Sequence, residues 1–583
     1  MTEDATRISV VPGEMQPWTD YGPDLPPTGS PAVARWLHDV APAGRRALVA
    51  GPHSDELVLL LAQHCAEVTV LLRSPSDARE LAERLHDSGV AVVAGALDGL
   101  AAQSEGGFDV ILALDGLDRL HSTDSPALSW ADRYRLLSGL TSDDATILLG
   151  LENEFSVGNL LDTRPASRRH GDEEWRPLHS DASRPTSLGR LREHVASGDR
   201  AARAVWAVFG DVHGTSRRQV IASTAATDAA APGHPLPGLV VEALRDASGP
   251  VLTDPAEATE LAVRAGLLGS VPDSWLTVVA PAAAAEPAGH DLLACTGAVL
   301  LVADLRVTDD IREWVLHEAS PAGGTPAGQP VVGSVARTPD AVPATVPDQP
   351  SVAHHLQLLA EAEDVPAFRA LAARLGDWVR SRDAADREVL VLDAIHEDAG
   401  SFAPGFSGLR WSEPLSAESA LAVAWLRFQD DLLERSRRHP WPPWMVGDEL
   451  VRTWSRMSGA EPDDAVLTQA RELADAVAAH DAQPGPAPDV RTALAHAEEA
   501  QQEVADLRGH IFGLERTLGF RDRQLRSRDE KILELRAMTA RMERIENSSV
   551  YTFARRASAV RRPRAFAAKV KKRVRSELKR RSR

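Results

Sequence analysis

Five short apolar segments separated by helical patterns constrain the fold of the N-terminal part of the chain. The apolar segments lie at 46–50, 67–72, 90–94, 108–114 and 145–151. Amphipathic patterns typical of helices lie between them at 54–65, 75–87 and 129–140. Strands that are apolar throughout and alternate with helices indicate a parallel sheet covered on both faces. We therefore predict an α/β fold over residues 31–223.

Two further apolar segments, 203–209 and 218–222, follow a long polar stretch. Gly210 and Gly214 lie between them and supply turn residues. Two short strands joined by a glycine-containing turn are typical of a β-hairpin. We expect a terminal antiparallel hairpin at the end of this domain.

This order of elements resembles the class I S-adenosylmethionine-dependent methyltransferases. The likeness includes Phe108-Asp109-Val110-Ile111 as the fourth strand and Leu151-Glu152-Asn153 closing the fifth. It covers about a third of the chain, and its order of elements is more specific than its individual motifs. The resemblance implies a Rossmann-like methyltransferase domain with adenosylmethionine as cofactor.

The resemblance places the cofactor at the carboxyl ends of the strands. In that family a Gly-x-Gly-x-Gly turn follows the first strand, and an acid at the end of the second accepts hydrogen bonds from the ribose. Here the glycine positions hold Gly51, His53 and Asp55, and the second strand ends at Leu72 and Arg73. The residues implied to contact the cofactor are Ala50, Gly51, Pro52, His53, Leu72, Arg73, Leu97, Asp98, Leu114 and Asp115.

Two interpretations of this edge are open. The first is a working cofactor site, in which Asp98 is the acidic residue beside the adenine pocket. The second is a Rossmann-like sheet that binds no cofactor, because the glycines and the acid are missing. The absent carboxylate alone would cost the ribose a charge-assisted bond of roughly 1.5–3 kcal/mol. No residue is singled out as catalytic.

A third interpretation concerns a metal. His53-Ser54-Asp55-Glu56 after a strand is similar to the His-Pro-Asp-Asp-Glu motif of zinc-dependent sugar N-deacetylases, where His and Asp bind Zn²⁺. The motif is one residue short, and the later histidine cluster of that family is not found. We therefore predict no metal site.

A polar segment after the fifth strand could form a substrate mouth, because ligands of open α/β sheets bind at the carboxyl ends of strands. For any one of these residues an ordinary surface loop is the simpler interpretation. The candidates are Glu152, Asn153, Asp162, Arg164, Trp175, Arg184 and Thr186.

Breaks rich in Pro, Gly and Ala divide the chain. We expect a disordered lead-in at 1–30, the methyltransferase-like domain at 31–223, and a mixed α/β domain of unknown role at 238–481. Five tryptophans between Trp411 and Trp454 are expected to form the core of the second domain. A long helix follows at 489–547, and a basic tail at 548–583.

The long helix carries a heptad pattern. Apolar side chains occupy positions a and d from Val490 to Met542, which predicts a coiled coil about 80 Å long. Arg521 and Arg528 interrupt position d. A parallel homodimer is the favoured interpretation, and a single helix folded back on the body is the alternative.

The basic tail contrasts with an acidic body. Residues 548–583 hold ten Arg, four Lys and one Glu, whereas the whole chain has a net charge of −20. Phe566, Val570, Val574 and Leu578 recur every four residues and form an apolar stripe on a cationic helix. This pattern is typical of a helix that lies on an anionic membrane, and no recognised nucleic-acid module accompanies it.

The chain has two cysteines and no apolar run long enough to span a bilayer, so we expect a cytoplasmic protein that is peripheral on the inner face of the plasma membrane. The coil and basic end also resemble the C-termini of bacterial enzymes that build surface polysaccharides. The leading hypothesis is a methyltransferase-like protein acting on a sugar or glycolipid. The alternative is a catalytically inactive scaffold that recruits partners through the coil and tail.

Overall fold

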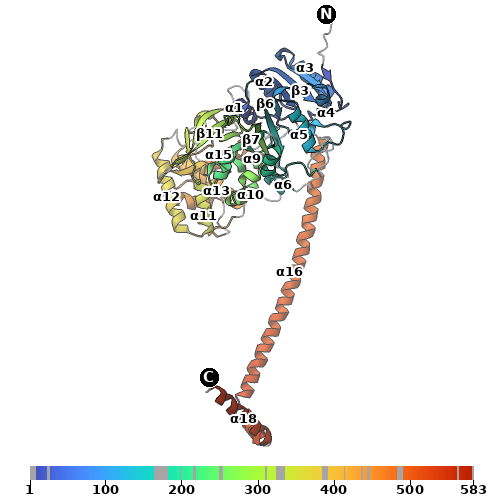
Figure 1. Ribbon diagram of the computed structural model, residues 1–583. Helices are drawn as coiled ribbons and strands as arrows, with labels where there is room; N and C mark the ends of the chain where they lie inside the picture. Colours follow the sequence, from blue (N-terminus) through green and yellow to red (C-terminus); the bar gives the residue numbers. More distant parts are fainter. Residues whose placement is uncertain are drawn as a thin grey trace. The chain divides into compact units, whose positions relative to one another are not determined.

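The chain forms two compact units, Met1–Gln483 and Pro484–Arg583 (Figure 1). The computed structural model describes residues 8–16, 18–22, 26–162, 181–196, 199–213, 218–247, 254–308, 311–322, 335–383, 391–398, 400–411, 414–434, 437–442, 445, 447–481, 490–560 and 563–580.

The first unit is built on a sheet whose first half is parallel. Its strand order is β1 (Ser9–Val10), β4 (Ala91–Ala94), β3 (Cys65–Leu72), β2 (Gly44–Ala50), β5 (Phe108–Ala113) and β6 (Thr141–Glu152). All five neighbouring pairs are parallel. The chain winds outward from β2 to β4 and then returns to β5, so the switch point lies between β2 and β5. The five predicted strands are confirmed.

Helices cover both faces of this half, as the apolar strands require. Along β2, Leu48 and Ala50 pack into one core cluster while Ala47 and Val49 pack into another. The helices are α1 (Pro31–Val40), α2 (Asp55–His64), α3 (Pro75–Arg84), α4 (Leu97–Gln103) and α5 (Trp130–Gly139). Serine N-caps fix the starts of α1, α2, α3 and α5. Helices α2, α3 and α5 begin within one residue of the starts predicted at 54, 75 and 129, whereas α1 was not predicted.

The second half of the sheet is antiparallel and continues without a break. After β6 the order is β9 (Ser274–Pro281), β7 (Arg200–Phe209), β8 (Arg218–Ser223), β10 (Leu292–Thr296), β11 (Val299–Val307), β12 (Arg312–Pro321) and β14 (Thr345–Pro347). The predicted antiparallel pair β7–β8 is present. However, β9 lies between β6 and β7, so the boundary expected at 224–237 falls inside one continuous sheet.

Helices α9 (Pro235–Ala247) and α10 (Pro255–Arg264) follow β8, after the short α8 (Thr224–Ala229). A helical layer then contains α11 (Val352–Glu361), α12 (Val365–Ser381), α13 (Ala417–Glu434), α14 (Asp448–Met457) and α15 (Asp464–Asp481). Two small sheets join this layer: β13 (Val335–Arg337) with β17 (Leu409–Trp411), and β15 (Ile395–Asp398) with β16 (Ser401–Pro404).

The tryptophan cluster is core, as predicted. Trp425 and Trp454 are fully buried, Trp411 and Trp441 are buried, and Phe368 packs among their rings. Trp444 lies outside the described residues. The aromatic side chains therefore hold the helical layer together and are not available to stack on a sugar.

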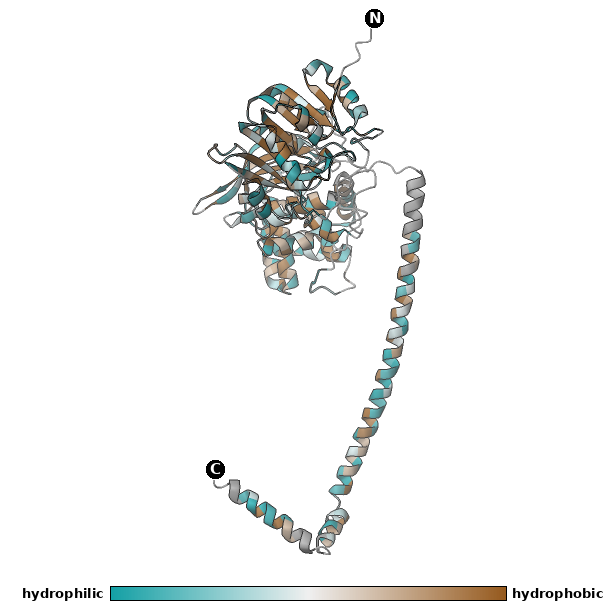
Figure 2. Ribbon diagram, turned by 45° about the vertical axis from the view of Figure 1, so that its right-hand side comes forward, coloured by the Kyte–Doolittle hydropathy of each residue, from teal (hydrophilic) through white to brown (hydrophobic). Residues whose placement is uncertain are grey.

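The second unit consists of helices. Helix α16 (Val490–Glu546) has 57 residues and is followed by α17 (Ser549–Val560) and α18 (Pro563–Arg580). The hydropathy colouring shows apolar residues recurring along α16 (Figure 2). The long helix is confirmed, and its pairing with a second copy stays a prediction. Within the described residues, no helix is long and apolar enough to cross a membrane.

Candidate functional site

The structure brings the predicted cofactor residues to one edge of the sheet. The carboxyl ends of parallel strands meet at the same edge, and each group lies at or beyond one of these ends. Ala50 ends β2 and is followed by Gly51, Pro52 and His53, while Leu72 ends β3 and is followed by Arg73. Leu97 and Asp98 begin α4 after β4, and Leu114 and Asp115 follow β5. The prediction of a shared location is thus consistent with the sheet order.

The lead-in of the chain runs across this edge. The backbone N–H of Val11 donates to Ala94 O at 2.9 Å, and that of Met15 donates to Arg73 O at 2.8 Å. Further along, the N–H of Thr28 donates to Pro52 O at 3.1 Å. The expectation of disorder at 1–30 is therefore wrong for 8–16, 18–22 and 26–30, because backbone bonds to three strand ends hold this segment.

Glycines after β4 allow the lead-in to approach closely. A Cβ atom at Gly95, whose φ is +147°, would overlap Val11, and one at Gly99 would overlap the carbonyl of Pro12. Close backbone approach is the usual role of glycine at a cofactor edge. Here the chain's own backbone occupies that space.

Arg73 takes the position where the family has an acid, and Asp20 of the lead-in pairs with it. The Arg73 Nε donates to one carboxylate oxygen of Asp20 at 3.1 Å and Nη2 donates to the other. Nη1 donates to His121 O at 2.9 Å. The two side chains are 1% and 2% exposed. In this buried bidentate pair both carboxylate oxygens of Asp20 already accept from Arg73.

A second buried pair fills the space after β5. Arg119, in the short 3₁₀ turn Asp118–Leu120, pairs through two nitrogens with Asp115, and Thr28 Oγ1 donates to Asp115 Oδ1 at 3.1 Å. Burial opposes ionisation of Asp115, but the Arg119 guanidinium outweighs it and holds the pKa of that carboxyl at about 2. Asp98 accepts a hydrogen bond from Ser125 Oγ at 2.6 Å.

His53 bridges two parts of the edge. Its Nδ1 donates to Gly51 O at 3.1 Å, and its Nε2 accepts the backbone N–H of Leu114 at 3.1 Å. These two bonds fix a neutral tautomer, and burial lowers the pKa of His53 to about 4. The imidazole therefore ties the turn after β2, where Gly51 has a φ of +90°, to the end of β5.

The zinc interpretation of this segment is wrong. Both ring nitrogens of His53 bond to backbone groups, and Asp55 forms an ion pair with Arg84 at 2.8 Å on the surface. The two would-be ligands have separate partners and separate environments. A metal would need both of them free and converging.

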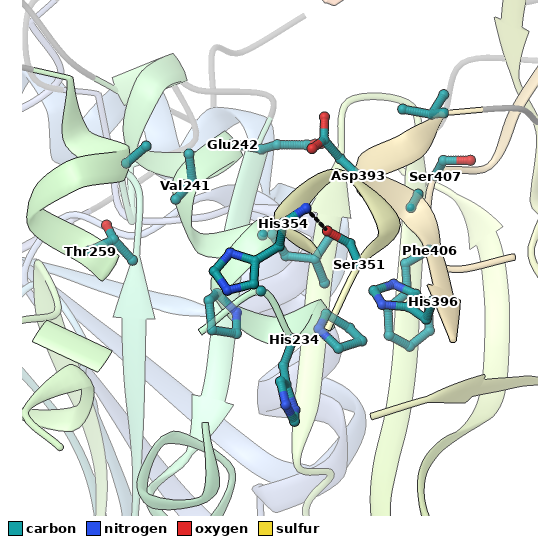
Figure 3. A pocket seen from close by; sticks show the side chains of 18 of the residues that line it. His234, Val241, Glu242, Thr259, Ser351, His354, Asp393, His396, Phe406 and Ser407 are labelled. Atoms are coloured by element: carbon teal, nitrogen blue, oxygen red, sulfur yellow. Dashed lines mark hydrogen bonds between the residues drawn. The ribbon is translucent and has the colours of Figure 1, made fainter. Parts of the chain in front are cut away.

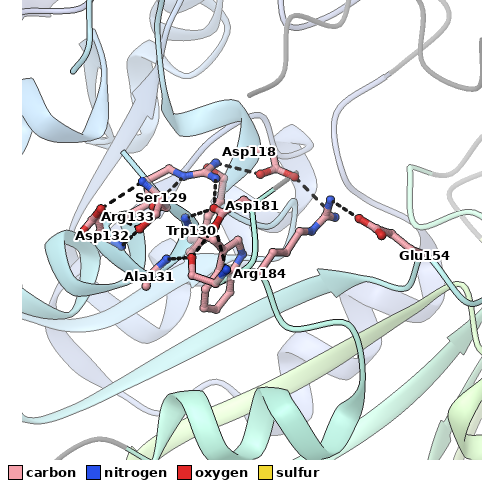
Figure 4. Close-up of polar contacts among 11 residues, drawn as sticks. Asp118, Ser129, Trp130, Ala131, Asp132, Arg133, Glu154, Asp181 and Arg184 are labelled. Carbon is pink, nitrogen blue, oxygen red and sulfur yellow. Dashed lines mark hydrogen bonds and ion pairs between the residues drawn. The ribbon is translucent and has the colours of Figure 1, made fainter. Parts of the chain in front are cut away.

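Arg184 of the predicted substrate mouth belongs to an ion-pair network (Figure 4). Arg133 pairs with Asp118 at 2.8 Å and lies 3.8 Å from Asp181. Arg184 reaches Asp118 at 3.6 Å and Glu154 at 3.1 Å. The network ties α5 to the segments that follow β5 and β6.

Other candidates of the mouth also have structural partners or lie elsewhere. Glu152 pairs with Arg184 at 3.3 Å, and the buried Asn153 side chain donates to two carbonyls, those of Ser270 and Pro272. Asp162 and Thr186 lie near the surface, whereas Arg164 and Trp175 are outside the described residues.

A cavity of about 560 Å³ lies in the first unit, away from the predicted cofactor residues (Figure 3). It is lined on one side by α9 and α10 and on the other by the helical layer and its small sheets. Its volume is in the range of small-molecule sites. Glu242 and Thr259 line one side, and His396, Phe406 and Ser407 line the other. The lining also includes four arginines, Arg218, Arg245, Arg337 and Arg427.

Among the described residues, Arg427 Nη1 and Ser407 Oγ are buried at this cavity without a hydrogen-bond partner. His396 donates from Nδ1 to Gln349 O at 2.8 Å, and burial lowers its pKa to about 4. Its neutral Nε2 is left as an acceptor. The cavity can thus hold a polar ligand that offers acceptors to Arg427 and Ser407.

Sequence reasoning did not find this cavity. Its lining comes from segments spread between Arg218 and Arg427, and no motif joins them. The only signal in the sequence is the recurrence of His and Arg near strand and helix ends of the middle region, and such residues are common on surfaces.

No protein-family profile and no curated protein matches the chain. Among solved structures, the N-methyltransferase NodS from Bradyrhizobium japonicum is similar at 18% identity over 21% of this chain and 59% of NodS, with a TM-score of 0.18. The plantazolicin methyltransferase BamL is similar at 10% identity over 43% of this chain and 83% of BamL, with a TM-score of 0.24. The Bacillus YcgJ protein covers 43% of this chain at 12% identity and a TM-score of 0.23.

The chain therefore spans 59% of the length of NodS. These values describe a distant likeness in fold and carry no implication for activity. The strand order with its switch point between β2 and β5 is Rossmann-like and agrees with a methyltransferase-like fold.

Proposed function

We propose that the protein is a catalytically silent scaffold with a methyltransferase-like fold, whose cofactor edge is closed by its own lead-in. The observation that carries this proposal is the Arg73–Asp20 pair, buried where the family places the ribose acid. Opening the edge costs the energy of separating this bidentate pair and of releasing the backbone hydrogen bonds that hold the lead-in. Adenosylmethionine would have to supply that energy before gaining any affinity.

Titration of the full chain with adenosylhomocysteine tests the closed edge. We expect no heat in calorimetry and no shift of the thermal midpoint at millimolar ligand. Saturable binding with a micromolar dissociation constant would contradict the proposal. It would also revive the alternative, methyl transfer to a sugar or glycolipid in surface-polysaccharide assembly.

The scaffold acts through the second unit, and we assign α16 to pairing with a second copy of this chain. The apolar side chains of its heptad are about half exposed, which is the state expected of a seam without its partner. They include Val504, Leu507, Ile511, Leu514, Leu518, Leu525, Ile532, Leu535 and Met542.

Sedimentation equilibrium of the full chain tests this pairing. Leu507→Glu places a charge in the seam, and we expect it to convert a dimer to a monomer. Gln502→Glu adds the same charge at an outer heptad position and should leave the dimer intact. A monomeric wild-type chain, or equal effects of both substitutions, would refute the assignment.

The basic end of the second unit is assigned to an anionic membrane surface. Val550 and Phe553 of α17 are 77% and 75% exposed, and α18 presents Val570 and Val574 beside its cationic side chains. Apolar side chains within a strongly basic helix are suited to the interface of a bilayer that contains acidic lipids. This would hold the scaffold at the inner face of the plasma membrane.

Vesicle sedimentation tests the membrane assignment. Each basic residue near an anionic surface contributes about 1 kcal/mol, so Lys571→Glu with Lys572→Glu should weaken binding about thirty-fold or more. Arg523→Glu with Arg526→Glu makes the same change in charge on α16 and should have a much smaller effect. Binding that is equally strong to zwitterionic vesicles would contradict the assignment.

A further inference from the structure

Three potential metal ligands gather on the antiparallel half of the sheet, far in sequence from the predicted cofactor residues. His290 lies two residues before β10, Asp304 lies on β11, and His317 lies on β12. Their ligand atoms all lie within 4.8 Å of one another. They thus lie on, or just before, three strands that are neighbours in the sheet.

A β-bulge places His317. Val302 pairs with Glu318 and Ala303 pairs with Leu316, so His317 has no partner on β11. A bulge of this kind bends a strand and re-aims one side chain. Here the re-aimed imidazole reaches the carboxylate of Asp304, with Nε2 at 2.7 Å from Oδ2.

His290 contacts the same carboxylate. Its Nδ1 lies 3.1 Å from Asp304 Oδ1, and the centroids of the two imidazole rings are 5.0 Å apart. The side chains of His290, Asp304 and His317 are 23%, 41% and 44% exposed. Solvent can therefore reach the cluster, and positions beyond the three protein atoms are open to water.

Neighbouring groups hold two of these residues in place. The backbone N–H of Asp291 donates to Asp304 Oδ1 at 3.0 Å, and Trp206 Nε1 donates to the carbonyl of His290 at 2.9 Å. Asp291 is itself fixed by Ser223 Oγ at 2.6 Å. Supporting bonds of this kind orient the ligands of protein metal sites.

We propose that His290, Asp304 and His317 bind a divalent transition-metal ion, with Zn²⁺ as the ion best suited to the set. Two imidazoles and one carboxylate favour Zn²⁺ or a related ion over Ca²⁺ and Mg²⁺, which prefer oxygen ligands throughout. A site with three protein ligands keeps at least one position for water. This site is independent of the closed cofactor edge and of the scaffold assignment.

Titration of the metal-free full chain with Zn²⁺, and with Co²⁺ as a spectroscopic probe, tests the site. We expect the wild type to bind one equivalent that His317→Ala and Asp304→Asn each weaken at least tenfold. The visible absorption of bound Co²⁺ should disappear in both variants. Asp304→Asn keeps the shape of the side chain, so its effect reports on the ligand rather than on folding.

His86→Ala serves as the matched control, because His86 is an exposed histidine whose partners are the adjacent Asp87 at 3.0 Å and the carbonyl of Glu83 at 3.1 Å. It should leave the affinity and the Co²⁺ spectrum unchanged. If the wild type and both cluster variants bind Zn²⁺ and Co²⁺ equally, the three side chains form only a hydrogen-bonded cluster and the proposal is overturned. Equal loss in His86→Ala would overturn it as well.

Discussion

Substitution of Asp20 by Ala should loosen the lead-in and destabilise the first unit. The substitution removes both carboxylate bonds to Arg73 and leaves the guanidinium charge 1% exposed. Removal of one partner from a buried pair costs about 3–5 kcal/mol. The matched exposed pair is Asp55 with Arg84, where Asp55→Ala should cost about 1 kcal/mol or less.

Two measurements check this prediction. Chemical denaturation of the full chain, followed by the tryptophan fluorescence of the first unit, gives the change in unfolding free energy. Hydrogen exchange shows where the loss occurs, because the amides of Val11 and Met15 bond to the ends of β4 and β3. We expect those amides to exchange faster in Asp20→Ala than in the wild type.

A double variant separates the charge from the contact. Asp20→Ala with Arg73→Met removes both charges and keeps an apolar side chain, so it should be more stable than Asp20→Ala alone. The reasoning is refuted if Asp20→Ala costs less than about 1 kcal/mol with unchanged exchange at Val11 and Met15. It is equally refuted if the double variant is the less stable of the two.

The remaining predictions concern His53 and the glycine after β4. Because burial lowers the pKa of His53 to about 4, its neutral form stabilises the fold above the unfolded value near 6.5, and about 3 kcal/mol of unfolding free energy should be lost as the pH falls from about 6.5 to 4. His53→Gln should remove this part of the pH dependence in denaturation measured over that window. Gly99→Ala places a methyl group against the Pro12 carbonyl and should speed exchange of the lead-in, whereas Gly139→Ala, with open space around it, should not; equal exchange in the two variants would contradict the packing of the lead-in.

The parallel strands could be predicted because burial on both faces leaves a simple trace in the sequence. The end of β2 is an example, because four consecutive residues there are fully buried and apolar: Ala47, Leu48, Val49 and Ala50. No polar residue interrupts the apolar pattern of this strand. The carboxyl ends of such strands meet at one edge, so the location of the cofactor residues followed from the strand order. The contacts of the lead-in with that edge could not be predicted, since the lead-in lies outside the alternating pattern of strands and helices.

The lead-in was missed because its composition is polar and rich in proline, which is typical of disorder. Its stability comes from backbone bonds and from one carboxylate, Asp20, that pairs with a residue 53 positions away. Arg73 in place of an acid was a sign that a negative partner must exist. The sequence contains many acids, however, and local spacing does not tell which one lies at the strand end.

The position of β9 affects how the first unit folds during synthesis and which fragments of the chain can fold. Ser274–Pro281 forms the strand between β6 and β7, although β7 and β8 precede it in the chain. When only the first 223 residues have been synthesised, β9 is missing, and β6 and β7 each have an unpaired edge where β9 would pair. The sheet closes only when this later strand arrives, which predicts slow formation through long-range pairing. A fragment ending at 223 should aggregate, whereas one that extends past the helical layer should fold.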